Sequence, residues 1–231
     1  MRKIVAVVAV VAASALLASC GSSSSSSASP PPSTPVSGTV GGRAFTPAAT
    51  QAISATSGTT ACTTPVPFGA SAIELSLTSY GTSEACTDLL GVKCATHASS
   101  QAVTIFVAKV NLASPTPAPA VATGTHPITP ITGQMEAGNP AIVDVAYAEA
   151  SAPDPSCAGT AHPVTSGSIR LDQVSASGPV TGHLDLTFDD GSKISGDFSA
   201  SMCTGTPPNV CMVAANAIGG QLCVPQASCT P

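Results

Sequence analysis

The 231-residue sequence has no tryptophan, two tyrosines and five phenylalanines, and only 8% of its residues are charged. Seven Lys and Arg side chains against twelve Asp and Glu cannot form the dense basic face that binds nucleic acid. The chain also lacks the aromatic stacking platforms common in carbohydrate and single-strand binders. Because 43% of the residues are hydrophobic, a disordered polyelectrolyte is not expected either. A mostly neutral globular domain remains.

Several motifs that carry chemistry are also absent. The sequence contains no GxGxxG, P-loop, HExxH or EF-hand pattern, so nucleotide, zincin and regular calcium sites lack their usual support. No Cys-x-x-Cys pair occurs. Cys94 and His97 form a Cys-x-x-His, but no second pair lies at ligand spacing. We therefore expect neither a metal site nor a cofactor.

The N-terminus carries the most specific pattern. Arg2 and Lys3 precede residues 4–17, an apolar stretch interrupted only by Ser14. This order is typical of a secretory signal peptide. The stretch is too short for a membrane-spanning helix, which needs about 20 apolar residues. One alternative is ordinary cleavage after Ala13-Ser14-Ala15, which has the small-x-small form.

The residues Leu17-Ala18-Ser19-Cys20 resemble the lipobox of bacterial lipoproteins. The resemblance implies transfer of a diacylglycerol to the Cys20 sulfur, cleavage before Cys20, and often acylation of the new amino terminus, for example with palmitate. Two or three acyl chains hold a protein on a membrane stably, since each buried methylene contributes about 0.8 kcal/mol. Gly21 follows where Asp would imply inner-membrane retention, so the family rule favours the outer membrane if the cell is Gram-negative.

These features divide the chain into three parts. Residues 1–19 are the expected signal peptide, and residues 20–35, rich in Ser and Pro, are predicted to be a flexible tether. Residues 36–231 are predicted to form one β-rich globular domain with a cysteine-rich tail at 203–231. The tether would average about 20–25 Å from end to end, so the domain works near the membrane without lying on it.

The domain is expected to be all-β. Apolar and polar residues alternate over 73–78, 168–172 and 183–188, which predicts half-buried strands. Residues 103–110 and 141–148 are nearly continuous apolar runs, as in strands covered on both faces. The 21 prolines argue against a helical bundle, although short helices are predicted at Thr46-Pro47 and over 83–90. We predict a disulfide-stabilised antiparallel β-sandwich or barrel of about seven to nine strands.

One hairpin can be predicted with its register. Asp189-Asp190-Gly191 suits a three-residue loop with glycine at a positive φ, which pairs Phe188 with Ser192. The apolar side chains then share one face, whereas a two-residue Asp190-Gly191 turn would mix apolar and polar faces. The predicted opposing pairs are Leu186 with Ile194, Leu184 with Gly196, Gly182 with Phe198, Thr187 with Lys193, Asp185 with Ser195 and His183 with Asp197.

This register places four chemically active side chains on one face: His183, Asp185, Ser195 and Asp197. They suggest a hydrolase, but a serine nucleophile usually lies on a strained turn such as G-x-S-x-G, which the sequence lacks. Cross-strand His–Asp and Asp–Ser pairs are ordinary on a solvated sheet face. We therefore assign no catalytic residue and do not expect an enzyme, with these four as the only candidates.

Two further histidines occur in similar segments, His126-Pro127 and His162-Pro163. Together they could present two imidazoles to a metal or an anion. The pattern is more typical of loops that lead into strands, because proline keeps the preceding residue extended.

Apart from Cys20, eight cysteines remain in a chain that is expected to be exported, which favours up to four disulfides. By spacing, local bridges are predicted for Cys86 with Cys94, Cys203 with Cys211, and Cys223 with Cys229. Such bridges would hold down the tail, at about 2–4 kcal/mol each. The eight candidates are Cys62, Cys86, Cys94, Cys157, Cys203, Cys211, Cys223 and Cys229.

Together these patterns predict an exported, lipid-anchored envelope protein that acts as a structural or binding module. Its expected partner is the membrane, through the lipidated N-terminus, and not nucleic acid. Two alternatives stay open: a small envelope hydrolase that uses His183 with Asp197 or Asp185, and a carrier of a lipid or small ligand. A carrier requires an apolar cavity.

Overall fold

A computed structural model describes residues 33–56, 68–94, 97–128, 133–156, 158–159, 161–175, 177–211, 213 and 222, with backbone only at 133–135. The signal peptide, the lipobox with Cys20 and most of the tether lie outside the described residues. Cys62, Cys157, Cys223 and Cys229 do so as well. The residues from Ser33 onward belong to one compact unit.

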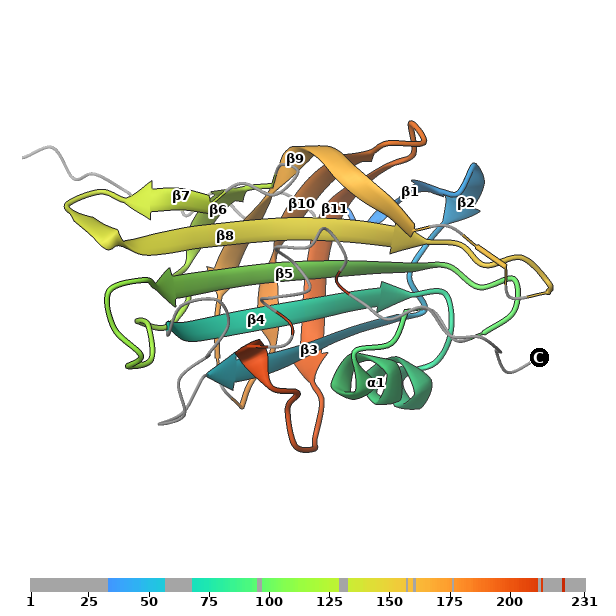
Figure 1. Ribbon diagram of the computed structural model, residues 1–231. Helices are drawn as coiled ribbons and strands as arrows, with labels where there is room; N and C mark the ends of the chain where they lie inside the picture. The colour runs from blue at the N-terminus through green and yellow to red at the C-terminus, as the bar shows by residue number, and fades with distance from the viewer. Residues whose placement is uncertain are drawn as a thin grey trace, which may run out of the picture. The chain divides into compact units, whose positions relative to one another are not determined.

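The described part of this unit contains eleven strands and one helix, α1 (Thr82–Gly91) (Figure 1). The strands are β1 (Ser37–Val40), β2 (Arg43–Phe45), β3 (Ala49–Thr56), β4 (Gly69–Thr78), β5 (Ala102–Asn111), β6 (Gly124–Pro127), β7 (Gly133–Glu136), β8 (Asn139–Ser151), β9 (Ala161–Gln173), β10 (Val180–Phe188) and β11 (Lys193–Met202). The predicted all-β class is thus confirmed, and so is the helix expected over 83–90. The helix predicted at Thr46-Pro47 is wrong, because these residues only connect β2 to β3.

Seven of the strands close into a barrel in the order β10-β9-β8-β5-β4-β3-β11, and β11 pairs again with β10. The remaining strands flank it: β1 and β2 extend from β11, β6 pairs with β9, and β7 pairs with β8. An odd number of strands cannot alternate in direction all the way round a closed barrel. One pair must therefore be parallel, and it is the short contact of β11 with β3 at Ser201–Gln51 and Met202–Ala52.

The predicted hairpin is confirmed in β10 and β11. Each predicted pair is present, from Thr187 opposite Lys193 to Gly182 opposite Phe198. The amide of Phe188 donates to the carbonyl of Ser192 at 2.9 Å, and Gly191 has a φ of 82°. The apolar face of the hairpin is buried inside the barrel, since Leu184 and Leu186 are fully covered. The buried face therefore sets the register.

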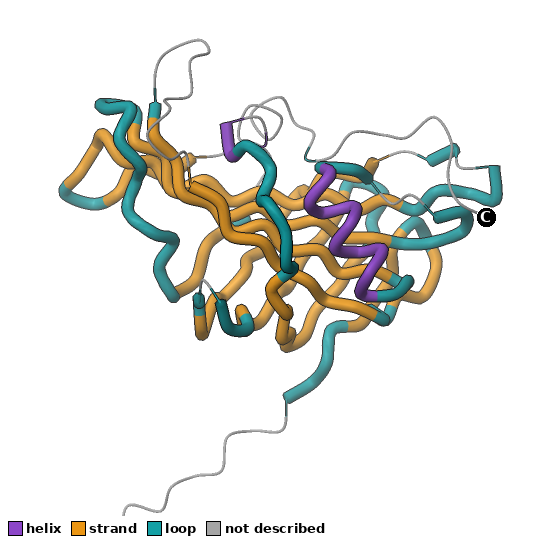
Figure 2. Tube along the Cα trace, turned by 90° about the horizontal axis from the view of Figure 1, so that it is seen from below, coloured by secondary structure: helices purple, strands orange, loops and turns teal. Residues whose placement is uncertain are grey.

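The outer face of the barrel is covered along β4 and β5. The run at 73–78 was expected to be half-buried, but every position of β4 is buried, including Glu74 and Ser76. Helix α1 packs against β3 and β4 (Figure 2), and described residues after β11 cover the same sheet. Burial of a Val or Leu side chain contributes about 1.5–3 kcal/mol. The buried residues of this covering segment are Val210, Val213 and Leu222.

A long-range disulfide fixes the start of this segment. Cys86 of α1 is bonded to Cys203, just after β11, across 117 residues of sequence. The local bridges predicted for Cys86 with Cys94 and Cys203 with Cys211 are therefore wrong. Helix α1 packs on β3 and β11 pairs with β3, so the fold brings the two cysteines together. Cys94 and Cys211 are also disulfide-bonded.

Loops lie against the strands at both ends of the barrel. The hydroxyl of Ser71, near the start of β4, donates to the carbonyl of Ala118 at 2.6 Å. At the other end of the barrel, just before β5 begins, the Gln101 side chain donates to the Val40 carbonyl at 2.8 Å. Between these ends the interior is filled by large apolar side chains, among them Leu75, Ile105 and Ile169.

Candidate functional site

The four predicted candidates share the outer face of β10 and β11, as two separate cross-strand pairs. The Nδ1 atom of His183 lies 2.7 Å from Oδ1 of Asp197, its cross-strand partner. The amide of Thr34, near the end of the predicted tether, donates to Oδ2 of the same carboxylate at 3.1 Å. The hydrogen bond with His183 is the main reason that the pKa of Asp197 lies below its usual range. Asp197 is therefore occupied by two structural contacts.

Ser195 lies away from this pair. Its cross-strand partners are Asp185 on β10 and Ser37 on β1. No hydrogen bond between the Ser195 hydroxyl and His183 occurs among the described residues. A serine nucleophile needs a base within about 2.6–3.2 Å, with donors for the developing oxyanion nearby. The outer face of β10 and β11 shows the His–Asp pair but not the remaining contacts of a triad.

His162 lies in a different cluster, beside the turn between β10 and β11. Its Nδ1 atom is 2.9 Å from Oδ1 of Asp189, and its Nε2 atom is 3.9 Å from Oδ2 of Asp190. The three side chains offer one nitrogen and two oxygen ligands within 4.8 Å of one another. Asp190 also accepts hydrogen bonds from the amide and hydroxyl of Ser192, at 2.9 and 2.8 Å, which stabilise the turn.

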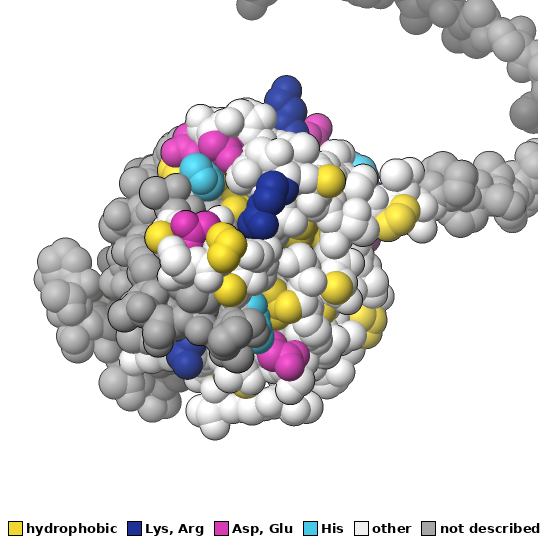
Figure 3. All heavy atoms as spheres, turned by 90° about the vertical axis from the view of Figure 1, so that its right-hand side faces the viewer, with side chains coloured by type: hydrophobic (Ala, Val, Ile, Leu, Met, Phe, Trp, Pro, Cys, Tyr) yellow, Lys and Arg dark blue, Asp and Glu magenta, His cyan; other side chains and the backbone are white. Residues whose placement is uncertain are grey.

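The imidazoles of His126 and His162 are too far apart to bind one metal or anion together. His126 lies on β6 opposite Ile169 of β9, whereas His162 lies at the start of β9. Seven residues of strand separate these positions, which is about 23 Å. Figure 3 shows one face of the molecule, on which charged side chains stand singly or in small groups among uncharged atoms.

A third place was not expected from the sequence: a small hollow on the outer face of the barrel. We call it the Glu74 hollow. It lies between the sheet and the segment after β11, it is partly open to solvent, and its cavity volume is about 10 Å³. Its lining comprises Ile53 and Ala55 of β3, Ala72 and Glu74 of β4, Phe106 of β5, and Pro208, Val210 and Val213 of the covering segment.

Among the described residues of this lining, Glu74 is the only one with a polar side chain. In register it lies between Ile53 of β3 and Phe106 of β5, and only 4% of its surface is exposed. Its Oε2 atom has no hydrogen-bond partner among the described residues. Burial raises the pKa of Glu74 to about 8, because a charged carboxylate loses its hydration there. At neutral pH the group is mostly an uncharged acid.

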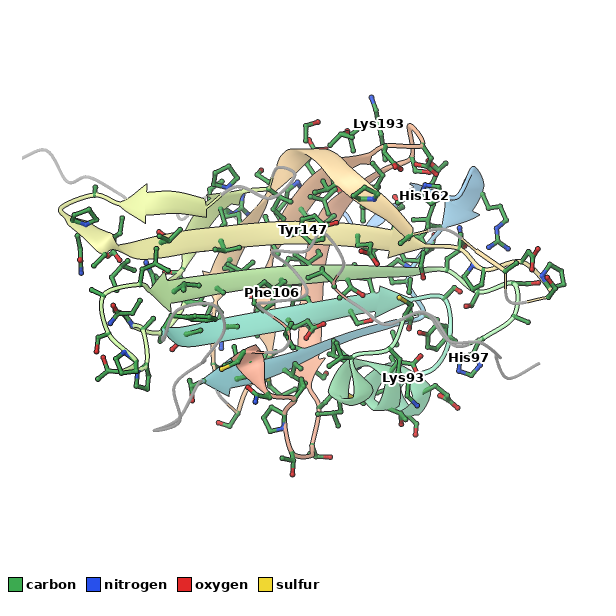
Figure 4. The ribbon with its side chains drawn as sticks, viewed as in Figure 1. Lys93, His97, Phe106, Tyr147, His162 and Lys193 are labelled. Atoms are coloured by element: carbon green, nitrogen blue, oxygen red, sulfur yellow. A yellow bond between two sulfur atoms is a disulfide. The ribbon has the colours of Figure 1, made fainter. Side chains whose placement is uncertain are left out.

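A second buried acid lies two strands away on the same face. Glu149 of β8 is 3% exposed, and one of its oxygens accepts the amide of Leu222 at 3.3 Å. Burial raises the pKa of Glu149 to about 7, although this hydrogen bond acts in the opposite direction. Between the two acids lie Phe106 and Tyr147, which are paired across β5 and β8 (Figure 4). Glu149 thus helps to hold the covering segment, whereas Oε2 of Glu74 forms no hydrogen bond with the described residues of that segment.

The sequence did not predict this hollow, because Glu74 occupies a polar position in an alternating strand. Such a residue is normally read as facing solvent. The available signal was indirect: residues 103–110 of the neighbouring strand are apolar on both faces, so something must cover the outer face there. The valines at 210 and 213, outside any strand pattern, supply that cover.

Comparison with protein-family models, with curated proteins and with solved structures found no match to this chain. In the described part of the chain, no helix is both long and apolar enough to cross a membrane. The candidate site therefore rests on the geometry and chemistry of these residues.

Proposed function

We propose that this protein is an exported, lipid-anchored binding module of the cell envelope, with its ligand site in the Glu74 hollow. The observation that carries the binding role is the unpartnered Oε2 atom of Glu74, which faces an otherwise apolar lining. Leaving a buried polar group without a partner costs about 1–3 kcal/mol. A ligand that supplies the missing hydrogen bond recovers that free energy on binding.

The proposed location rests on the N-terminus. Arg2, Lys3, the apolar stretch at 4–17 and the lipobox ending at Cys20 support export followed by lipidation. A Ser/Pro-rich tether then separates the lipid from the barrel. A tethered domain can sample ligands near the membrane surface without lying on it.

Binding is favoured over catalysis by the composition of the hollow. General acid–base chemistry requires a positioned partner, such as a second titratable group or a nucleophile. Among the described residues of the lining, Glu74 is the one titratable group, and the other seven are apolar. Apolar walls with a single polar group that fixes orientation are typical of a small-molecule binding site.

The binding role can be tested by filling the hollow. Ala55 is a half-buried residue of the lining, so Ala55→Phe places a ring in the hollow with little disturbance of the core. Ala44→Phe, at an exposed position of β2, is the matched control. Mature lipidated protein in nanodiscs is titrated with a set of small-molecule fragments while the methyl resonances of Ile53, Val210 and Val213 are recorded. We expect saturable shifts that Ala55→Phe abolishes and Ala44→Phe preserves.

If no fragment shifts these methyl groups, or if Ala55→Phe leaves the shifts intact, the hollow is not a ligand site. The anchor is tested separately by metabolic labelling with an alkyne analogue of palmitate. We expect label on the wild type and none on Cys20→Ala. Equal labelling of the two proteins would refute lipidation at Cys20, whatever the hollow binds.

A further inference from the structure

Three side chains that can ligate a metal meet at one end of the barrel, apart from the Glu74 hollow. They are His162 at the start of β9 and the two carboxylates of the β10–β11 turn, Asp189 and Asp190, and we call them the turn cluster. His162 lies opposite Ala150 of β8, which is fully buried on the inner face of the barrel. Its imidazole therefore lies on the inner side of the sheet, where the barrel ends at the turn (Figure 4).

Backbone and side-chain contacts hold the turn cluster in place. The amide of Asp189 donates to the carbonyl of Pro163 at 3.0 Å, which ties the turn to the residue after His162. The amide and the hydroxyl of Ser192 both donate to the carboxylate of Asp190. Contacts of this kind orient the ligands of a metal site and raise its affinity. The side chains of His162 and Asp190 are only 22% and 17% exposed, so the cluster is positioned before any ion binds.

The two carboxylates of the turn cluster have no lysine or arginine partner. In the part of the chain that the structure describes, Asp189 and Asp190 form ion pairs with His162 alone. Lys109 and Arg170 form theirs with other carboxylates. When the imidazole is neutral, as a metal ligand must be, the cluster carries two negative charges. A divalent cation balances them.

The spacing of the donor atoms suits a single ion. The Nδ1 atom of His162 is 2.9 Å from Oδ1 of Asp189, and its Nε2 atom is 3.9 Å from Oδ2 of Asp190. With one atom taken from each residue, the three donors lie within 4.8 Å of one another. Ligands at about 2.0–2.2 Å from one Zn²⁺ ion are about 3.0–3.6 Å apart. Because one imidazole gives an ion only one nitrogen, side-chain movements of about 1 Å would bring the donors to that spacing.

We infer that the turn cluster of His162, Asp189 and Asp190 binds a divalent transition-metal ion of the zinc type, with water in the remaining coordination positions. The donor set decides the class of metal. Imidazole nitrogen suits zinc and its neighbours in the first transition row. Ca²⁺ takes about six to eight oxygen ligands, so two carboxylates and an imidazole suit it poorly. Three protein ligands and a water are typical of an open zinc site.

The test is metal binding by the mature lipidated protein, with its disulfides intact and without an affinity tag. Chelator-treated protein in phosphatidylcholine nanodiscs is titrated with ZnCl₂, MgCl₂ and CaCl₂ at pH 7.5 by isothermal calorimetry, with empty nanodiscs as the blank. We expect one Zn²⁺ per chain, bound at least about a hundredfold more tightly than Mg²⁺ or Ca²⁺. The imidazole resonances of His162 should shift on addition of zinc, and those of His183 should not.

Variants that each remove one donor identify the site. Asp189→Asn and His162→Gln should weaken zinc binding at least about tenfold. The side chain of Asp189 is 46% exposed, so asparagine there leaves the core intact. The matched control is His183→Gln, which breaks the imidazole–carboxylate pair with Asp197 on the outer face of β10 and β11. This control should bind zinc as wild type does.

Three outcomes would overturn the inference. If zinc binds no more tightly than Ca²⁺, or if both Asp189→Asn and His162→Gln bind zinc like wild type, the turn cluster is only a His–Asp ion pair. If His183→Gln loses zinc binding to the same degree, the ion binds elsewhere. None of these results bears on the Glu74 hollow, which is tested separately with Ala55→Phe.

Discussion

The buried acid Glu74 makes a quantitative prediction about stability and pH. Its pKa is raised to about 8 in the folded protein, against an ordinary value of 4.5. Between these two values the unfolded chain releases the proton while the folded protein keeps it. The contribution of Glu74 to stability is therefore fully present below pH 4.5 and is lost as the pH rises toward 8.

The magnitude follows from the two pKa values. One pH unit of differential protonation is worth about 1.4 kcal/mol. Integrated from pH 5 to pH 8, Glu74 should lower the free energy of unfolding by about 3 kcal/mol. Such a loss is a large fraction of the stability of a typical domain, which is about 5–15 kcal/mol. Glu149 should act in the same direction but less strongly, because burial raises its pKa only to about 7.

The assay is urea unfolding at pH 5, 6, 7 and 8 with the disulfides intact, on the wild type and on Glu74→Gln. Glutamine keeps the shape of the side chain and does not titrate. The wild type should lose stability across this range by about 3 kcal/mol more than Glu74→Gln does. Glu149→Gln should retain the Glu74 part of the slope. If the difference between wild type and Glu74→Gln is the same at pH 5 and pH 8, Glu74 is not buried as an uncharged acid.

Three further predictions concern the frame around the hollow. Replacing both Cys86 and Cys203 by Ala opens a loop of 117 residues and should lower the free energy of unfolding by about 2–5 kcal/mol. The measurement is a urea titration without reductant, and an unchanged midpoint would contradict a stabilising bridge. Gly167→Ala should cost more than about 2 kcal/mol, because φ is 142° and a Cβ atom would collide with the Asp185 carbonyl. The control Gly42→Ala, with a φ of 70° and open space around it, should cost only about 1 kcal/mol, and equal costs would refute the collision. His183→Ala should change stability by less than about 1 kcal/mol, since it breaks a half-buried cross-strand pair with Asp197 on the outer face. A larger loss in thermal unfolding would contradict this minor structural role.

Local patterns in the sequence were sufficient for segments of β4, β5, β8, β9 and β10 and, through one hairpin, for β11. The alternation over 183–188 and the Asp189-Asp190-Gly191 loop predicted each pair of β10 with β11. This succeeded because register in an antiparallel hairpin depends on neighbouring residues and on which face is apolar. The His183–Asp197 pair followed from the same register, since it is a consequence of the hairpin alone.

The contacts between distant segments were decided by the tertiary structure alone. Whether the sheet is a sandwich or a barrel depends on the short parallel contact of β11 with β3, which no local pattern encodes. The same contact places Cys203 beside α1, so spacing along the chain predicted the wrong partner for Cys86. The sequence identifies Glu74 as a polar residue of a strand. Its burial as a neutral acid depends on the tertiary structure, in which Pro208, Val210 and Val213, after β11, pack beside it. Burial is a property of the assembled fold, and the proposed chemistry of this protein depends on it.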